Sequence, residues 1–261
     1  MKASIKEVQK FIEESELVLV GIGEEFERKL LLEKEPEYLE VCDYIRQAGK
    51  EWAIPYVNTY WLRMRLQDKV VAALRNLQSM LEGKNYFLVS TCMNGFLREA
   101  GFGEERVVEP CGSYRQIQCP DGCEGSLEPA DEMLLRQIEE AINGVRSWED
   151  LQCPRCVVCK KEKIFNNLYA ENYLEQGYLP QWERYMKWLQ GTIKRNVCIL
   201  ELGEGLKYPQ IIRWPFEKTA YLNKKAIFVR VHEKLYHLTP ELSEQGYSVD
   251  QNAVDFFTEV L

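Results

Sequence analysis

Two closely spaced pairs of cysteines give the chain its clearest chemical signal. Cys119 and Cys123 are separated by three residues, and Cys153 and Cys156 are separated by two. A pair at such a spacing can present two thiolates from one turn, and two such turns together supply the four sulfur ligands of a tetrahedral zinc ion. The sequence therefore predicts one Zn2+ ion per chain, held by Cys119, Cys123, Cys153 and Cys156.

A fifth cysteine in the same region leaves two alternatives open. Cys153, Cys156 and Cys159 form a C-x2-C-x2-C run, which is a spacing found among ligands of iron–sulfur clusters. The C-x3-C-P continuation of a ferredoxin does not follow, however. The second alternative is that the cysteines hold no metal at all. We expect zinc ahead of both, with Cys159 outside the ligand set, because the pairing is regular.

Two further cysteines and an asparagine follow short apolar segments. Cys92 and Asn94 come directly after the run 85–91, and Cys111 follows a short strand expected at 106–109. Open α/β sheets bind their ligands at the carboxyl ends of the strands, so these three residues are the candidate catalytic residues. A reactive thiol pair and two small side chains that only fill space both fit this pattern. The chain has 2 histidines, both far along the sequence, so no cysteine–histidine pair can be identified.

The elements that must position these residues alternate between strands and helices. Apolar runs typical of buried parallel strands occur at 17–23, 85–91, 197–203 and 225–231, and helical patterns occur at 57–81 and 181–194. This alternation predicts an α/β fold, a doubly wound parallel sheet with helices on both faces. Residues 115–165 break the alternation, and we expect them to form a small cysteine-rich zinc module inserted between 1–114 and 166–261, the two halves of one domain.

Two glycine-rich segments at predicted strand ends are candidates for binding phosphate. Gly21-Ile22-Gly23 ends the first apolar run, and Gly203-Glu204-Gly205 ends the third. Glycines in such turns let backbone N–H groups approach a diphosphate. Neighbouring acidic residues, Glu24 and Glu25 above all, oppose this interpretation, because a carboxylate roughly 4 Å from a phosphate costs about 1 kcal/mol in water. We therefore expect any diphosphate ligand to bind weakly.

The overall composition restricts the classes of partner. The 261 residues are 46% hydrophobic and 28% charged, which is typical of a globular protein, and the net charge is −8. An acidic chain is a poor ligand for nucleic acid or an anionic membrane. No apolar run approaches the roughly 20 residues that span a bilayer, and the first residues lack the apolar segment of a signal peptide. The expected location is therefore cytoplasmic.

Taken in order, these segments resemble the sirtuins, a family of NAD-dependent protein deacylases and ADP-ribosyltransferases. The resemblance rests on VLVGIGEEF, LVSTCMNGFLREAG, VVEPCGSYRQIQC, the cysteine pairs, YAE near residue 170, ILELGEGLKYP and AIFVRV. It implies a Rossmann-like domain, a small zinc-bearing module and a cleft for NAD between them. The cofactor-binding residues that it implies are Gly21, Ile22, Gly23, Gly203, Glu204, Gly205 and Arg230.

The departures from the family fall on the residues that carry its chemistry. Cys111 stands where sirtuins have the histidine that acts as general base, and Cys92 and Asn94 replace an asparagine and an aspartate that contact the nicotinamide ribose and carboxamide. Arg230 replaces an asparagine near the adenosine. We therefore expect a sirtuin-like protein that binds NAD or an ADP-ribose-type nucleotide, together with a protein or peptide partner, and that lacks ordinary lysine deacylase activity. The alternative is an active NAD-consuming enzyme, a deacylase, an ADP-ribosyltransferase or an NAD hydrolase, that uses Cys111 in place of the histidine.

Overall fold

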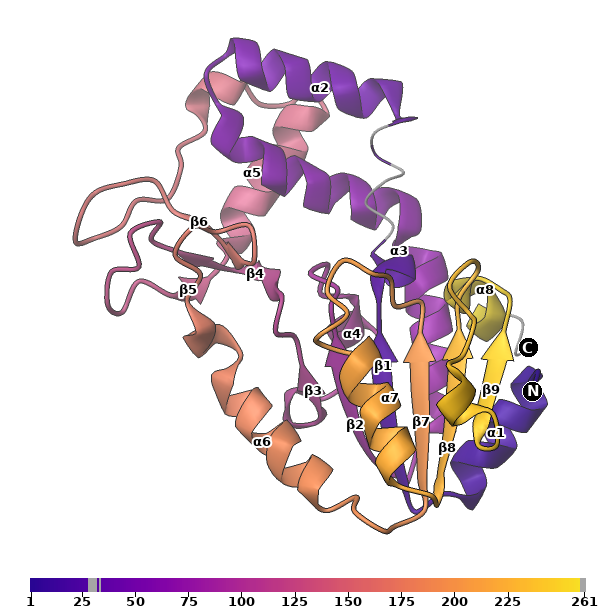
Figure 1. Cartoon of the computed structure of the whole chain (residues 1–261). Helices are drawn as coiled ribbons and strands as arrows, with labels where there is room; N and C mark the ends of the chain where they lie inside the picture. The colour runs from indigo at the N-terminus through magenta and orange to yellow at the C-terminus, as the bar shows by residue number, and fades with distance from the viewer. Residues whose placement is uncertain (28–31, 33, 259–261) are drawn as a thin grey trace.

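A six-stranded parallel sheet forms the centre of the larger part of the chain (Figure 1). The computed structural model describes residues 1–27, 32 and 34–258. The strands follow the order β3-β2-β1-β7-β8-β9, and every neighbouring pair is parallel. Their bounds are β1 (Leu17–Ile22), β2 (Asn85–Ser90), β3 (Val107–Val108), β7 (Val197–Leu202), β8 (Ala226–Val231) and β9 (Gly246–Val249). The predicted α/β class is confirmed.

The central strands β1 and β7 are buried along their whole length because helices cover both faces of the sheet. Every residue of β1 and of β7 is buried. Parallel strands covered on both faces have continuous apolar runs in their sequence instead of alternating apolar and polar residues. The four runs were therefore visible in the sequence. The outermost strand, β9, is short and only half buried, and its sequence GYSV carries no comparable signal.

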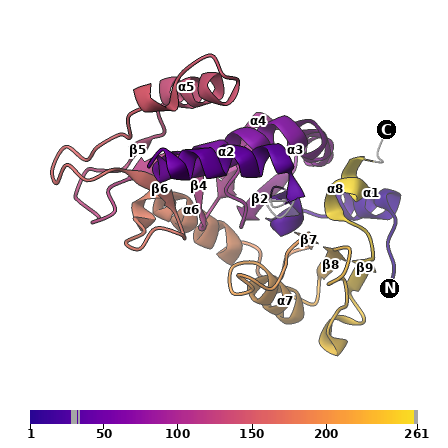
Figure 2. The same cartoon turned by 90° about the horizontal axis from the view of Figure 1, so that it is seen from above.

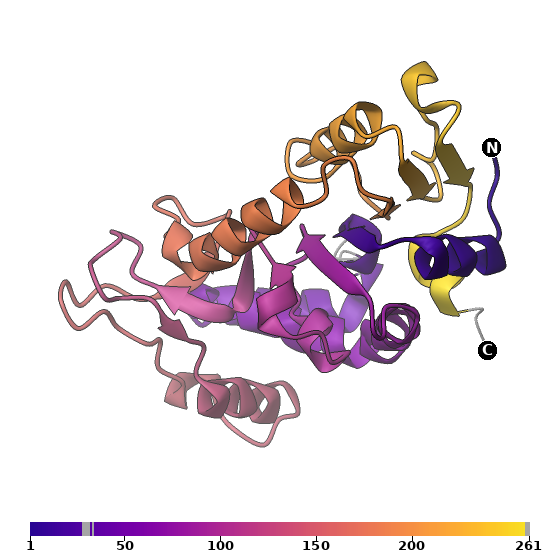
Figure 3. The same ribbon diagram turned by 90° about the horizontal axis from the view of Figure 1, so that it is seen from below.

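Helices pack on the two faces of the sheet as two separate layers. One face carries α1 (Ile5–Glu14), most of α3 (Ile54–Met80), α4 (Phe96–Glu99) and α8 (Ala253–Thr258), and the other carries α6 (Leu179–Gln190) and α7 (Arg213–Leu222). Figures 2 and 3 show these layers from opposite ends of the sheet. Helix α1 begins with a capping box, in which Ser4 and Glu7 satisfy each other's backbone N–H groups. Short 3-10 turns lie at Glu24–Phe26, Glu51–Ala53, Glu104–Arg106, Trp148–Asp150, Glu175–Gly177 and Pro240–Leu242.

A smaller unit lies beyond the carboxyl ends of the strands. It contains a three-stranded sheet, β4 (Gly112–Gln118), β5 (Glu128–Pro129) and β6 (Ile164–Asn167), in the order β5-β4-β6, together with α5 (Glu132–Ile142). Helix α2 (Pro36–Gln47) packs against α3, and α3 packs against α5, so helices that precede the predicted insert pack with the insert itself (Figure 1). The division into 1–114 with 166–261 and a module at 115–165 stays a prediction.

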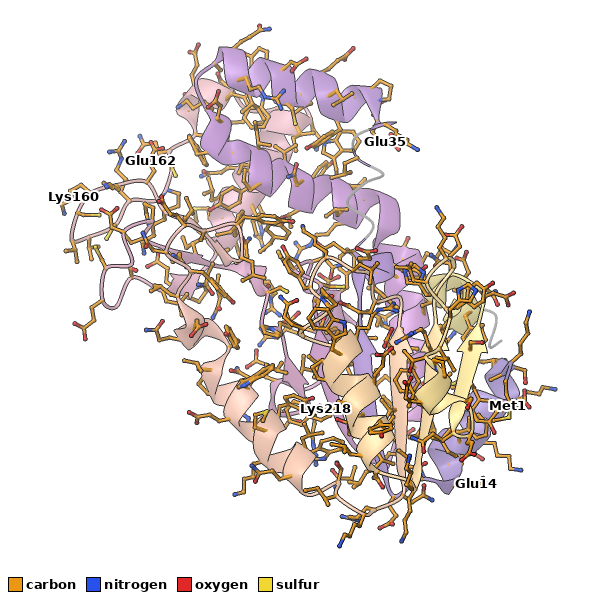
Figure 4. The ribbon with its side chains drawn as sticks, viewed as in Figure 1. Met1, Glu14, Glu35, Lys160, Glu162 and Lys218 are labelled. Carbon is orange, nitrogen blue, oxygen red and sulfur yellow. The ribbon has the colours of Figure 1, made fainter. Side chains whose placement is uncertain are left out.

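The N-terminus and the cysteine-rich loops lie on opposite sides of the molecule (Figure 4). Met1 lies beside β9, where the Ser248 N–H donates to its carbonyl oxygen at 2.7 Å, while Lys160 and Glu162 mark the outer edge of the cysteine-rich loops on the opposite side (Figure 4). No helix in the described part of the chain combines the length and the apolar character that crossing a membrane requires.

Candidate functional site

The carboxyl ends of the parallel strands meet at one edge of the sheet and define the candidate site. Connections leave the sheet in opposite directions on either side of β1 and β7, which are neighbours in the order β3-β2-β1-β7-β8-β9. Ligands of open α/β sheets bind in the crevice at such a switch point. The loops after β1, β2 and β7 bring together three sets of residues that the sequence had singled out, at 23–25, 91–94 and 203–205.

The loops after β1 and β7 are in direct contact, and their glycines make that contact feasible. The Gly23 N–H donates to the Leu202 carbonyl at 2.9 Å, and the Glu25 N–H donates to the Gly203 carbonyl at 3.2 Å. A Cβ atom on Gly23 would collide with backbone atoms of Gly203 and Glu204. Gly203 itself has a φ of 64°, a conformation that glycine adopts without strain.

The other residues of the two glycine segments divide between strand and loop. Gly21 lies within β1, and a Cβ there would meet Ile212 and Phe216 at 2.5 and 2.8 Å, so this glycine lets α7 pack closely on the sheet. Ile22 is buried in the core. Gly205 lies in the loop, and a Cβ there would meet only the carboxylate of Glu24, which is exposed. Of the residues in the two glycine-rich segments, Gly23 and 203–205 are therefore those that lie in the crevice.

Glu204 carries a buried carboxyl group in this crevice. Its side chain accepts a hydrogen bond from Thr91 Oγ1 at 2.8 Å, and the residue is only 2% exposed. Burial raises the pKa of Glu204 to about 8, with smaller contributions from Glu201 and Glu24, while Thr91 and Arg213 act in the opposite direction. At neutral pH the group is therefore uncharged, and it can donate a hydrogen bond as well as accept one.

The raised pKa of Glu204 predicts a pH-dependent stability. A carboxyl group whose folded-state pKa exceeds its ordinary value of 4.5 stabilises the fold fully below pH 4.5, and this contribution is lost as the pH rises through about 8. Glu204→Gln keeps the shape of the neutral side chain and removes the group that titrates. Between pH 6 and pH 9 we expect the wild type to lose on the order of 2 kcal/mol more stability than Glu204→Gln, measured by urea unfolding. Parallel pH profiles for the two proteins would contradict this assignment.

The two glutamates that follow Gly23 have different surroundings. Glu25 is turned inward, where its carboxylate accepts hydrogen bonds from the backbone N–H groups of Glu233 at 2.9 Å and Ala253 at 2.7 Å. It thereby ties the end of β1 to the segment after β8 and to the first turn of α8. Glu24 remains exposed beside Gly205. Only one of the two carboxylates expected to oppose a phosphate is thus in a position to do so.

The two candidate cysteines are both buried thiols. Cys92 Sγ donates to the Gly23 carbonyl at 3.1 Å. Burial raises the pKa of Cys111 to about 12, with Glu204 and Glu27 adding to the effect, and burial raises the pKa of Cys92 in the same direction. Since the thiolate is the reactive form of cysteine, neither side chain has the properties of a nucleophile or a base at neutral pH. Their burial favours the space-filling alternative, and a catalytic role for the two thiols stays a prediction.

Asn94 connects two loops at the edge of the crevice. Its Nδ2 donates to the Phe26 carbonyl at 2.8 Å, and its Oδ1 accepts from the Phe96 N–H at 3.1 Å. The first bond holds the segment after β1, and the second satisfies a backbone donor at the start of α4. Asn94 therefore fixes the relative position of the loops after β1 and β2.

Arg230 lies inside the protein rather than in an open cleft. Its Nε and Nη2 donate to the two carboxylate oxygens of Glu201 at 2.7 and 2.9 Å, Nη2 also reaches Glu217 at 2.6 Å, and Nη1 donates to the His237 carbonyl at 2.6 Å. Arg213 joins the network and donates to the Glu204 carbonyl at 2.6 Å. The network holds the loops after β7 and β8, and a role for Arg230 in binding the cofactor stays a prediction.

The sequence did not single out His232 as a site residue, although it directly follows β8. Its Nδ1 accepts from the backbone N–H groups of Lys234 and Leu235 at 3.0 and 3.1 Å. Burial lowers the pKa of His232 to about 4, so the ring is neutral and its proton lies on Nε2. Among the described residues, Nε2 has no hydrogen-bond partner although it is buried. The available signal was the position of a histidine immediately after an apolar strand.

The cysteine cluster differs from the predicted ligand set at one position. Cys119, Cys123, Cys156 and Cys159 place their sulfur atoms within 4.8 Å of one another. Cys153 is outside this cluster, and its thiol donates to the Lys163 carbonyl at 3.6 Å. The set expected from the spacing is corrected accordingly, because Cys159 takes the place that was assigned to Cys153.

The turns that carry the four sulfurs fit a tetrahedral zinc ion. Zinc–sulfur bonds of about 2.3 Å separate the sulfurs of a tetrahedral site by about 3.8 Å, and Cys119 and Cys159 are 3.3 Å apart. Hydrogen bonds from the backbone N–H groups of Cys159 and Val158 lower the pKa of Cys156 to about 6, whereas the neighbouring Cys119 sulfur raises the pKa of Cys123. The thiolate that a metal requires is therefore favoured at Cys156 first. The donor set of four thiolates is typical of a structural zinc site.

Comparisons with known proteins relate the sequence to two ADP-ribosyltransferases. No protein-family model matches the chain. It is 24% identical over 187 residues to a protein ADP-ribosyltransferase of Staphylococcus aureus, covering 71% of this chain and 59% of that protein. It is 26% identical over 162 residues to a probable bifunctional ADP-ribose hydrolase/ADP-ribosyltransferase of Fusarium oxysporum, covering 60% of this chain and 26% of that protein. The chain thus spans less than two thirds of either relative.

Solved structures with a similar fold are sirtuins. Sir2Tm bound to a propionylated peptide matches 99% of this chain and 97% of its own, with a TM-score of 0.53 and 13% identity. A mutant Sir2 homologue in complex with ADP-ribose matches 97% of this chain and 94% of its own, with a TM-score of 0.55 and 13% identity. Sir2 with a p53 peptide and NAD+ matches 99% of this chain and 97% of its own, with a TM-score of 0.52 and 12% identity. The chain therefore has the Rossmann-like sirtuin fold, and the predicted resemblance is confirmed.

Proposed function

We propose that the protein binds NAD in the crevice between the ends of β1 and β7 and transfers ADP-ribose from it to an acceptor protein. The observation that carries this proposal is the position of Gly23 and of residues 203–205, whose backbone meets at the switch point of the sheet. Both curated relatives are named as ADP-ribosyltransferases, which favours this activity over that of a binding module without catalysis.

Two side chains of the crevice suit a dinucleotide ligand. Glu204, neutral at pH 7 because burial raises its pKa to about 8, can donate a hydrogen bond to a diphosphate oxygen. The buried Nε2–H of His232, at the end of β8, supplies a second donor that has no partner among the described residues. These donors offset part of the repulsion between the acidic loops and a diphosphate. Glu24 remains the main source of that repulsion.

The state of Cys111 opposes lysine deacylation and restricts the acceptor. NAD would supply an ADP-ribosyl group. The bond between its C1′ and the nicotinamide nitrogen would break, the nitrogen keeping the electron pair, and C1′ would form a new bond to an acceptor atom. Cys111, with a pKa raised to about 12, cannot take a proton as a histidine with a pKa near 7 does. The site therefore favours an acceptor that can attack without first losing a proton to a general base, such as a carboxylate.

The cysteine cluster has a structural role in this proposal. All four residues come from two turns of the small module, and with four protein ligands a zinc ion would keep no open position for substrate. We assign Cys119, Cys123, Cys156 and Cys159 to holding Zn2+ and thereby fixing the loops at 119–123 and 156–161.

A labelled-cofactor experiment tests the proposed activity. The purified protein is incubated with NAD that is labelled in its adenylate phosphate and with a mixture of extracted proteins, while an acetyl-lysine peptide is included as the alternative substrate. We expect label to become bound to protein in a form that survives denaturation, and we expect the peptide to keep its acetyl group. Deacetylation of the peptide without protein labelling would contradict the proposal and would restore deacylation as the function.

A further inference from the structure

Four arginines line one pocket beside the candidate site. Arg63 of α3, Arg98 at the end of α4, Arg115 of β4 and Arg136 of α5 face a pocket of about 550 Å³. Glu132 and Glu139 lie on its wall, so the lining carries more positive than negative charge. Such a concentration of cations is unexpected in a chain whose net charge is −8.

The arginines of this pocket are incompletely neutralised. Arg63 is paired with Glu99 at 3.3 Å, and Arg98 is paired with Glu104. Arg115 and Arg136 make neither a side-chain hydrogen bond nor an ion pair within the described part of the chain.

The position of Arg115 makes its lack of a partner costly. Its stem packs against Gly95, where a Cβ would collide with it, so the side chain is held in place. Burial lowers the pKa of Arg115, and the positive charges of Arg98 and Arg63 add to this effect, whereas Glu109 opposes it. Like charges held together in a half-buried pocket are stabilised by an anionic ligand.

We propose that this arginine pocket binds carboxylate side chains of an acidic segment of the acceptor protein. The inference rests on the proposed ADP-ribosyl transfer for the identity of the partner. Carboxylates suit the pocket better than a single phosphate, since the arginines come from four separate elements and two of them already hold carboxylates of the chain itself. The pocket also reaches Asn94 at the edge of the crevice, so a segment bound here extends toward the reacting centre.

A binding assay without NAD tests the pocket. The probe is a fluorescein-labelled hexa-aspartate peptide, and its affinity for the full chain is measured by fluorescence anisotropy at low and high salt. Arg115→Ala with Arg136→Ala should weaken binding by about tenfold or more, since each arginine contributes a charge-assisted contact. Arg184→Ala with Lys187→Ala, on the exposed face of α6, removes the same charge outside the pocket and should leave the affinity nearly unchanged.

The outcomes separate this inference from the proposed function. Equal binding by the two double variants, or displacement of the peptide by an equal concentration of inorganic phosphate, would overturn the pocket as a carboxylate site. Because the assay contains no NAD, neither result depends on ADP-ribosyl transfer. Conversely, failure to cleave NAD would contradict the proposed function while the peptide could still bind to the arginines.

Discussion

Under the proposed function, cleavage of NAD should fall by about 100-fold in the Gly23→Ala variant. The added methyl group meets backbone atoms of Gly203 and Glu204, which cannot rotate away, so the loops after β1 and β7 must separate. A displacement of about 1 Å at a reacting centre is sufficient for a loss of this size. The rate of nicotinamide release and the affinity for NAD by calorimetry measure the effect.

Gly191→Ala, at the end of α6 and outside the crevice, is the matched control for this variant. Gly191 has a φ of −68°, which alanine adopts without strain, and its added methyl group would lie 3.1 Å from the Trp188 carbonyl oxygen. The rate should therefore change by no more than about twofold. Similar rates for Gly23→Ala and the wild type, with both proteins folded by circular dichroism, would show that the contact between the two loops has no part in binding NAD.

Loss of zinc and of the structure around it should follow from Cys119→Ser combined with Cys156→Ser. These residues contribute one sulfur from each turn of the cluster, so the double variant retains only two ligands. Removing a structural metal ranks among the most destabilising changes to a protein, and we expect a loss on the order of 4 kcal/mol or more. Metal content by mass spectrometry and thermal unfolding of the full chain measure both effects.

Cys153→Ser separates the predicted ligand set from the observed cluster. Because Cys153 lies outside the group of four sulfurs, this variant should keep one zinc ion per chain, whereas Cys159→Ser should lose it. The reverse result would restore the set that the spacing predicted. Iron and sulfide in place of zinc would contradict the assignment of the metal.

The parallel sheet could be predicted because burial on both faces leaves a direct trace in the sequence. The runs expected at 17–23, 85–91, 197–203 and 225–231 correspond to β1, β2, β7 and β8. Strand β9 escaped detection because a half-buried edge strand of four residues, GYSV, has no apolar run. Helix α3 begins three residues before the predicted 57, since Pro55 occupies its first turn, where no N–H donor is required.

The cysteine ligands show where spacing alone is ambiguous. Cys153 and Cys156 have the same separation as Cys156 and Cys159, so the sequence allows either pair to form the second turn. The fold selects the second pair because Lys160 adopts a φ of 65° and its N–H donates to the Cys156 carbonyl at 2.9 Å, which closes the turn around Cys159. The spacing specifies neither the conformation of this turn nor its contact with Cys119, which lies 40 residues earlier in the chain.

The charges of the crevice were also beyond a sequence-based prediction. Glu25 and Glu204 read as two carboxylates facing a phosphate, yet Glu25 is directed at backbone N–H groups and Glu204 is uncharged at neutral pH because it is buried. Both facts depend on the packing of α8 and of the loops after β1 and β8, which no local pattern encodes. The position of these residues at strand ends could be predicted, but their ionisation could not.

The most direct test of ADP-ribosyl transfer at this crevice is the release of nicotinamide from NAD by the purified protein, with and without an acidic acceptor protein. The proposed function predicts release by the wild type, an increase when the acceptor is present, and loss of both in Gly23→Ala. NAD that binds to the wild type and remains intact under all of these conditions would contradict the proposal, and the protein would then be a nucleotide-binding module with the sirtuin fold.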